Sequence, residues 1–128
     1  MKATIMKRFT FEASHQLPNH EGQCHSLHGH SYKLEVYARG EIKSITDEEG
    51  DLNHDPEQGM VVDFGRISQV VKTQIMPLVD HKHLNDRFLV PTAELVAVWI
   101  LEVLSQYNMS VFKVRLWETE TCYAEVQL

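Results

Sequence analysis

The sequence Cys24-His25-Ser26-Leu27-His28-Gly29-His30 places one thiol and three imidazoles within seven residues, directly before a segment with strand-like alternation. Every second side chain of a strand points to the same face. A strand that begins near His28 therefore sets His28 and His30 side by side, with Cα atoms roughly 6–7 Å apart. Two imidazoles at this separation can bind one ion at a Zn–N distance of about 2.0–2.1 Å. Gly29 between them leaves room for another backbone or a ligand.

A third ligand would turn this pair into a metal site, and His15 at the end of the preceding strand is the candidate. Three neutral imidazoles with one open position are typical of catalytic rather than structural zinc. His20 and His25 compete for the third position, but both lie in a loop where nothing fixes them. The alternative is that these histidines are ordinary surface or core residues without a shared partner. The position of His15 favours the metal site.

Length and composition restrict the class of protein. The chain has 128 residues, of which 43% are hydrophobic, so we expect one domain over residues 1–128 with a buried core. A net charge of −6 argues against a nucleic-acid-binding surface, although a local basic pocket can still hold an anionic substrate. No apolar run approaches the roughly 20 residues that span a bilayer. With only two cysteines and no apolar signal core near the start, we expect a cytoplasmic protein with reduced thiols and no membrane contact.

Period-two alternation marks the strands. Residues 4–13 and 30–41 alternate between apolar and polar side chains and are predicted to form strands one and two. A short third strand is predicted at 60–62. Residues 111–118 and 121–127 are predicted to form a closing antiparallel pair joined by a tight turn. The order of elements predicts an α+β protein with an antiparallel sheet.

Helical periodicity marks two further segments. The first is predicted to begin after an N-cap at Asp63 and to close or kink at Pro77. The second is predicted to begin after an N-cap at Thr92 and to end at residues 107–108. We expect its buried stripe to consist of Leu95, Val96, Trp99, Val103 and Leu104. Residues 43–58 are rich in acidic side chains and are predicted to form a long, mobile hairpin loop.

The two cysteines have different predicted roles. Cys24 is a buried thiol, a fourth zinc ligand, or a base or nucleophile. The last interpretation makes the most specific prediction. A divalent cation and nearby imidazoles would lower the pKa of the thiol and so favour the thiolate. A thiolate in this position suits proton abstraction near neutral pH. Cys122 lies in the terminal strand and is predicted to be a small core residue.

Three charged or titratable side chains outside the histidine cluster are candidates for acid–base chemistry or binding. Asp80 and His81 are adjacent in a predicted loop, where a hydrogen bond between them would fix the imidazole tautomer and raise its basicity. Sequence alone favours a capping Asp beside a helix-end His, and His83 and Asp86 are alternatives for this role. Glu118 at a strand end is either solvated or binds a planar N–H/N–H edge with both oxygens.

These residues together resemble the 6-pyruvoyl-tetrahydropterin synthase/6-carboxytetrahydropterin synthase family. The segments that carry the resemblance are Phe11-Glu12-Ala13-Ser14-His15, Cys24 to His30 (Cys-x-x-x-His-Gly-His), Gly59-Met60-Val61-Val62-Asp63-Phe64, Asp80-His81 with Leu84-Asn85, Pro91-Thr92-Ala93-Glu94 leading into Trp99, and Trp117-Glu118-Thr119. Each segment is weak alone, but all six in this order are highly specific and cover essentially the whole chain.

The resemblance implies the tunnelling fold, with an antiparallel four-stranded sheet and two helices on one face. It implies a homo-oligomer in which three subunits close a barrel and two trimers stack into a homohexamer, with active sites between subunits. It also implies a zinc ion (Zn²⁺) held by His15, His28 and His30.

The resemblance further implies roles for five other residues. Cys24 would be the base that abstracts a proton, and Asp80 and His81 would form an acid/base relay. Glu118 would anchor the pterin and would be linked to that relay. Thr92 would contact the pterin from the neighbouring subunit.

Motif spacing resembles the queuosine-pathway branch, which has Cys-x3-His-Gly-His and an ending like that of residues 118–124 here. This branch implies a zinc-dependent carbon–carbon lyase in a tRNA-modification pathway. Its substrate is 7,8-dihydroneopterin triphosphate, and its products are 6-carboxy-5,6,7,8-tetrahydropterin, acetaldehyde and triphosphate. The alternative within the family is pyruvoyl formation by triphosphate elimination. Two features depart from the family pattern: His25 directly after Cys24, and the long acidic loop, which we expect to point away from the substrate.

Two more distant alternatives remain. Gly22-x5-His28-x-His30-x4-Glu35 fits the first cupin motif up to its last glycine, but the second motif needs glycines that are absent after Gly65. A non-catalytic metal-binding protein is the other alternative. Such a protein would not need Cys24.

Overall fold

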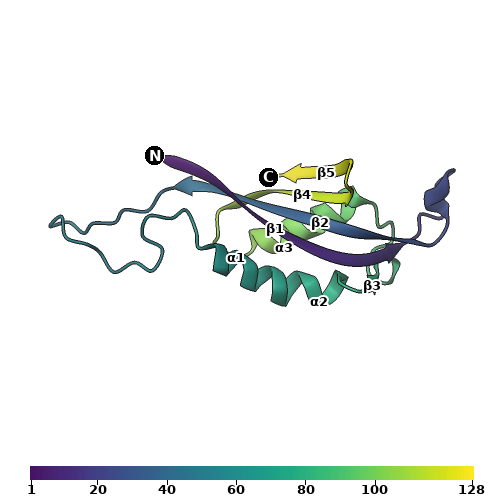
Figure 1. The fold of residues 1–128 in the computed structure, drawn as a ribbon, viewed down its shortest axis with the longest axis horizontal. Helices are drawn as coiled ribbons and strands as arrows, with labels where there is room; N and C mark the ends of the chain where they lie inside the picture. Colours follow the sequence, from purple (N-terminus) through teal and green to yellow (C-terminus); the bar gives the residue numbers. More distant parts are fainter.

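Two long neighbouring strands form the centre of the structure, a computed structural model that describes residues 1–128. Strands β1 (Lys2–His15) and β2 (His28–Glu41) pair antiparallel along their whole length, from Lys2 opposite Glu41 to His15 opposite His28. β4 (Val111–Thr119) pairs antiparallel with β2, and β5 (Cys122–Gln127) with β4 (Figure 1). The expected antiparallel four-stranded sheet is thus confirmed.

A fifth strand extends this sheet and was not predicted. β3 (Lys82–His83) runs parallel to β1 beside Ala13 and Ser14, which gives the strand order β3-β1-β2-β4-β5. The predicted strand at 60–62 is wrong, because these residues form no strand. Val61 and Val62 are buried in the core, so their apolar character reflects burial and not strand pairing.

Between β2 and β4 the chain forms a continuous helical stretch made of α1 (Phe64–Val70), the π-turn η2 (Val71–Ile75) and α2 (Met76–Val79). Asp63 is the N-cap, as predicted, and its side chain accepts a hydrogen bond from the Gly65 N–H at 2.8 Å. Pro77 does not end the helix. It lies in the first turn of α2, directly after the π-turn, where the loss of one backbone N–H costs little.

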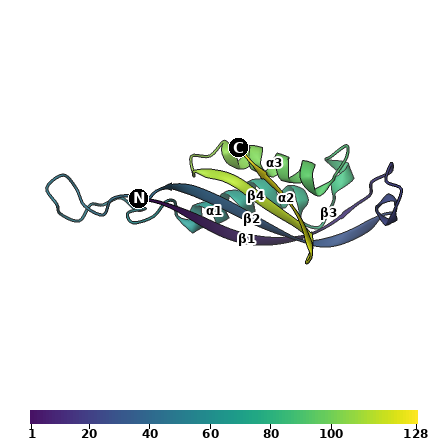
Figure 2. The same ribbon diagram turned by 90° about the horizontal axis from the view of Figure 1, so that it is seen from above.

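α3 (Ala93–Ser105) begins after the predicted N-cap, with the Thr92 hydroxyl accepting from the Leu95 N–H at 3.2 Å. Its buried residues are Ala93, Val96, Ala97, Ile100, Leu101 and Leu104. The predicted stripe was wrong at Leu95, which is 50% exposed, and Trp99 and Val103 are only partly buried. The two helical segments lie on the same side of the sheet (Figure 2). No helix combines the length and apolar character that crossing a membrane requires.

The helices cover the sheet face on which the histidines lie. Alternate residues of β1 and β2, among them Phe11, Tyr32 and Leu34, are buried in a core cluster of 24 residues. His15 and His30 follow the same alternation, so they continue this apolar face at one end of the two-stranded ladder.

The opposite face of the sheet is not covered by helices but contains one buried charge, Glu35. Its Oε2 accepts from Arg8 Nη2 at 2.6 Å, and its Oε1 accepts from the Tyr37 hydroxyl at 3.0 Å. Burial raises the pKa of the Glu35 carboxyl, but the hydrogen bonds that it accepts outweigh this effect, and its pKa lies below the ordinary value.

The acidic loop leaves the sheet at the end of β2 that is distant from the histidines (Figure 1). As expected, it points away from the predicted site. Glu57 fixes its base, because its Oε1 accepts from Lys43 Nζ at 3.2 Å and from Arg66 Nη1 at 2.6 Å. Backbone pairing between Thr46 and Leu52 closes the loop internally.

Candidate metal centre and active site

Three imidazoles converge at the end of the ladder. The Nε2 atom of His15 lies 3.0 Å from Nε2 of His28 and 3.2 Å from Nε2 of His30. Nitrogen ligands arranged tetrahedrally at 2.0–2.1 Å from zinc are about 3.3–3.4 Å apart. The spacing of these three atoms is therefore close to that of ligands around one ion.

Backbone carbonyls select the tautomers of two of these rings. His15 Nδ1 lies 2.9 Å from the Pro91 carbonyl oxygen, and His28 Nδ1 lies 2.6 Å from that of Ser26. A carbonyl only accepts, so each Nδ1 carries the proton and donates it. The Nε2 lone pairs then face one another, which is repulsive unless a cation lies between them. Hydrogen bonding of the distal nitrogen is also what orients metal-ligating histidines.

The backbone after β1 is held so that His15 cannot turn away. The Gln16 N–H donates to Asn85 Oδ1 at 2.8 Å, and Asn85 Nδ2 donates to the Gln16 carbonyl at 2.8 Å. The His15 side chain is completely buried. Together with the bond to Pro91, this clasp fixes both the ring and its backbone. The residues present therefore fit a bound metal ion.

The electrostatics of the cluster keep it in a metal-binding form. Burial lowers the pKa of His30, the neighbouring His15 and His28 lower it further, and the carboxylate of Glu118 opposes them. His30 is consequently neutral near pH 7, as a ligand must be. Burial also raises the pKa of Tyr32, whose hydroxyl lies 3.4 Å from His15 Nδ1, so Tyr32 remains protonated.

Glu118 lies beside the three rings, at the end of β4. Its Oε1 is 3.2 Å from His30 Nε2 and 4.0 Å from His15 Nε2. One ligand atom from each of these four residues lies within 4.8 Å of all the others. Sequence reasoning selected Glu118 as a substrate anchor but missed its closeness to the histidines. The available signal was parity, since Glu118 shares the strand face of the buried residues Val114 and Leu116.

Cys24 lies half-buried in the short 3₁₀ turn η1 (Gln23–His25), four residues before β2. The Leu17 N–H donates to the Cys24 carbonyl at 2.8 Å, so this turn belongs to the connection between β1 and β2, at the end of the ladder where His15 pairs with His28. The competing histidines of this loop, His20 and His25, are not among the four clustered ligand residues.

The Asp80 and His81 side chains lie next to each other, with His81 Nδ1 3.0 Å from Asp80 Oδ1. The Glu12 N–H donates to Asp80 Oδ1 at 3.0 Å, and the His81 N–H donates to the Glu12 carbonyl at 2.6 Å. The bond from Glu12 is the main reason why the pKa of Asp80 is lowered. The alternative residue His83 pairs instead with Ser14, with 3.0 Å between its Nδ1 and the hydroxyl oxygen.

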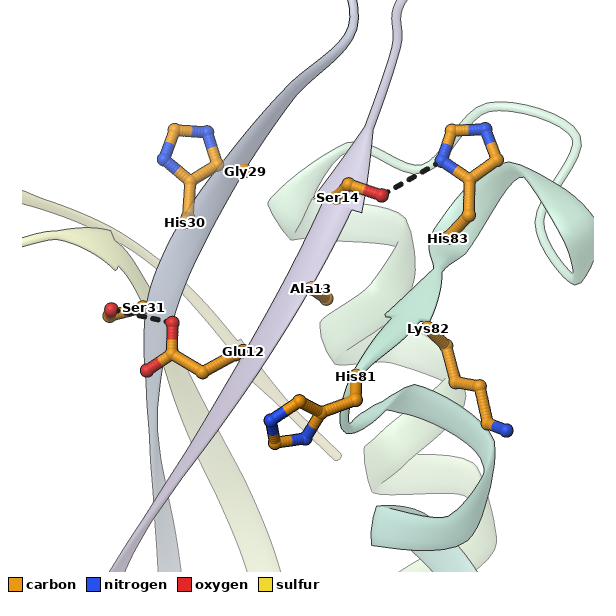
Figure 3. Close-up of a pocket in the computed structure, with 9 residues that line it drawn as sticks. All are labelled: Glu12, Ala13, Ser14, Gly29, His30, Ser31, His81, Lys82 and His83. Carbon is orange, nitrogen blue, oxygen red and sulfur yellow. Dashed lines mark hydrogen bonds between the residues drawn. The ribbon is translucent and has the colours of Figure 1, made fainter.

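This pair makes no polar contact with the metal cluster of its own chain. His81 lines an open hollow of about 450 Å³, in which its ring points towards β1 beside Glu12 (Figure 3). The Glu12 and Ser14 side chains alternate with His15 along β1 and so point to the opposite face of the ladder, but the hollow is also lined by Gly29 and by His30 of the cluster. No hydrogen bond or ion pair joins Asp80 or His81 to the three clustered histidines.

Comparison with known proteins places this geometry in a family. The family model described as 6-pyruvoyl tetrahydropterin synthase matches residues 4–128. The chain belongs to the 6-pyruvoyl tetrahydropterin synthase family. The resemblance inferred from the sequence motifs is thereby confirmed.

Relatives within this family carry different names. A protein of Synechocystis sp. named 6-carboxy-5,6,7,8-tetrahydropterin synthase is 39% identical over 127 residues, covering 94% of this chain and 89% of the relative. A protein of Pyrococcus furiosus named dihydroneopterin monophosphate aldolase is 34% identical over 121 residues, covering 92% and 91%. The solved 6-pyruvoyl tetrahydropterin synthase of Caenorhabditis elegans aligns with a TM-score of 0.81 at 24% identity, covering 100% of this chain and 96% of the other, which confirms the fold.

Two further pockets contain residues that the sequence predicted to bind the substrate. One, of about 300 Å³, has Glu118 in its wall and is otherwise lined by Ala93, Glu94, Cys122, Tyr123, Ala124 and Glu125. Thr92 lies in a separate small hollow beside the loop after β1. The prediction that Cys122 is a core residue was wrong: it is exposed, with its Sγ 2.9 Å from Thr119 Oγ1. It occupies the end of an edge strand, where one face is open to solvent.

Proposed function

We propose that this protein is a zinc-dependent 6-carboxy-5,6,7,8-tetrahydropterin synthase. It would convert 7,8-dihydroneopterin triphosphate and water to 6-carboxy-5,6,7,8-tetrahydropterin, acetaldehyde and triphosphate, a cytoplasmic step of queuosine biosynthesis. The observation that carries the proposal is the convergence of three imidazole Nε2 atoms and the Glu118 carboxylate at the end of the ladder. The name of the Synechocystis relative at 39% identity supports this product over others of the family.

Zinc is the metal that suits these ligands best, because three neutral imidazoles with an oxygen donor are typical of catalytic zinc sites. When bound, zinc would supply Lewis-acid polarisation of the hydroxyls on the substrate side chain. His15, His28 and His30 would hold it, and hydrogen bonds to backbone carbonyls orient the rings of His15 and His28.

Of the remaining groups, one would bind the substrate and the others would transfer protons. Glu118 would bind the planar N–H/N–H edge of the pterin through both carboxylate oxygens, as carboxylates bind guanidinium groups. The Cys24 thiolate would take a proton from the carbon side chain. His81, polarised by Asp80, would return a proton on the other side of that chain. Departure of triphosphate from the end of the chain would leave a side chain with two carbonyl groups. Addition of water and cleavage of the bond between these carbonyls would then leave a carboxyl group on the ring and release acetaldehyde.

His81 of one copy would serve the metal cluster of another, because within one chain no hydrogen bond or ion pair joins His81 to the three clustered histidines. Open sheet edges support such an assembly. β1 is paired on its outer side only by the two residues of β3, and β5 has no outer partner. Exposed edges of this kind pair with other chains, and three copies joined edge to edge would close a barrel. We propose a trimer or a dimer of trimers that binds a small molecule and no nucleic acid.

The decisive experiment is to incubate zinc-loaded protein with 7,8-dihydroneopterin triphosphate and to assay both acetaldehyde and triphosphate. Equal amounts of the two products are expected. Triphosphate without acetaldehyde would instead assign the pyruvoyl reaction. The Pyrococcus relative suggests aldol cleavage as a second candidate. That reaction would release a phosphorylated two-carbon aldehyde and no free triphosphate.

A further inference from the structure

Glu118 is the one residue that belongs to both the cluster of metal-ligating atoms and the wall of the 300 Å³ pocket. We propose that its carboxylate is a displaceable fourth metal ligand, which binds the metal in the substrate-free protein and leaves it when a pterin enters. This inference rests on the proposed function, since it names what controls the open metal position.

The geometry supports a weak ligand in the fourth position. Carboxylate oxygens bind zinc at about 2.0–2.2 Å, so tetrahedral geometry places such an oxygen about 3.4 Å from each imidazole nitrogen. Glu118 Oε1 is 3.2 Å from His30 Nε2, close to this value, but 4.0 Å from His15 Nε2. The oxygen therefore lies on the His30 side of the fourth position, within a small movement of a bond to the metal.

Nothing else in the structure holds this carboxylate. No lysine, arginine or backbone amide donates to Glu118; its polar neighbours are the rings of His15 and His30. Its side chain is 21% exposed, so it has access to solvent on the side of the pocket. The Glu118 carboxylate can therefore move from the metal to another ligand without breaking any other hydrogen bond or ion pair of the protein.

The pocket supplies the competing partner. Its walls come from the start of α3, the end of β4 and strand β5, and its volume is at the lower end for small-ligand sites. A pterin N–H/N–H edge needs both carboxylate oxygens for paired hydrogen bonds. Glu118 therefore cannot bind the metal and the pterin fully at the same time. Entry of the pterin would free the fourth position when the hydroxyls of the substrate arrive.

Binding at the two sites must then be coupled and reciprocal: a pterin weakens metal binding, and the metal weakens pterin binding. The experiment measures metal affinity by competition with a chromophoric chelator, with and without unsubstituted pterin. This probe has no side chain and cannot react. In the wild-type protein we expect pterin to weaken metal binding about tenfold, within the usual range of such coupling.

Two variants test the origin of this coupling. Glu118→Gln should bind the metal about 10- to 100-fold more weakly without pterin, and pterin should have no further effect. Glu120→Gln is the matched control: it removes a carboxylate two residues away whose side chain is 88% exposed, and it should behave like the wild type. Cobalt(II)-loaded wild-type protein should change its visible absorption when pterin is added.

Unchanged metal affinity in Glu118→Gln, or an unchanged cobalt spectrum on pterin addition, would overturn the ligand exchange. Neither result would affect the proposed reaction, which the acetaldehyde assay tests separately. Conversely, the protein could show pterin-dependent metal affinity but release no acetaldehyde. That result would contradict the proposed function and would still support the ligand exchange.

Discussion

Replacement of His15 by alanine is the most informative single perturbation of the metal centre. His15 is completely buried, and its Nε2 is the atom that lies close to those of both other rings. Its loss leaves two ligands from β2 and removes the donor to the Pro91 carbonyl. The remaining pair is the His-x-His arrangement, whose affinity for a metal ion is much lower than that of a three-ligand site.

The expected magnitude follows from the energy of a zinc–ligand set. Protein zinc sites with four ligands bind with about 10–16 kcal/mol, or about 2.5–4 kcal/mol per ligand. At 1.4 kcal/mol per factor of ten, His15→Ala should weaken zinc binding by roughly 100- to 1,000-fold. The truncation also leaves a cavity, so the free energy of unfolding of the metal-free protein should fall by a few kcal/mol.

The assay is a competition titration against a chromophoric chelator, with His20→Ala as the matched control. His20 is an exposed loop histidine that accepts a hydrogen bond from Gly22 and lies outside the metal cluster. We expect this control to bind zinc as the wild type does. Wild-type affinity in His15→Ala, or an equal loss in His20→Ala, would refute the assignment. Urea unfolding of each variant separates loss of the ligand from loss of the fold.

Four further predictions test the other groups. Cys24→Ala should abolish acetaldehyde release but retain zinc, whereas Cys122→Ala should keep full activity; full activity in Cys24→Ala would exclude the sulfur as the base. Mixing and reassembling the inactive Cys24→Ala and His81→Ala proteins should restore about a quarter of wild-type activity if each site is built from two copies, and none if it is built from one. Glu35 has a folded-state pKa below its unfolded value, so its contribution to stability is present above the unfolded pKa and is lost as the pH falls through the folded pKa. Glu35→Gln should therefore cost about 2 kcal/mol in urea unfolding at pH 7 and much less at pH 3, and an equal cost at both pH values would contradict the charge assignment. Asn85→Ala should reduce zinc affinity and lower the unfolding free energy by about 1–3 kcal/mol through the lost backbone clasp, and unchanged zinc binding would show that the clasp does not position the first ligand.

Local signals sufficed for much of the fold. The alternation in β1 and β2 identified both strands, because one face of each is buried under helices and the other is polar. The N-caps at Asp63 and Thr92 were predicted correctly, since capping depends on atoms within three residues. The same parity rule brought His28 and His30 together.

Errors arose where distant packing decides the outcome. Val61 and Val62 are buried by tertiary contacts, which an apolar triplet cannot distinguish from a strand. The π-turn before Pro77 allows the helix to continue and has no sequence signature. The position of Glu118 beside the rings depends on the pairing of β4 with β2, a contact between residues far apart in the chain. The position of His81 likewise depends on the pairing of β3 with β1, a contact between residues far apart in the chain.

The central claim is a metal held by three imidazoles with one exchangeable position, and a Cys24 sulfur that does not bind it. X-ray absorption at the zinc edge of the loaded, substrate-free protein tests it most directly. We predict three imidazole nitrogens and one oxygen at about 2.0–2.2 Å and no sulfur. A sulfur shell at about 2.3 Å would contradict this account, because Cys24 would then be a ligand and not a base. Fewer than three imidazoles would contradict the assignment of the site.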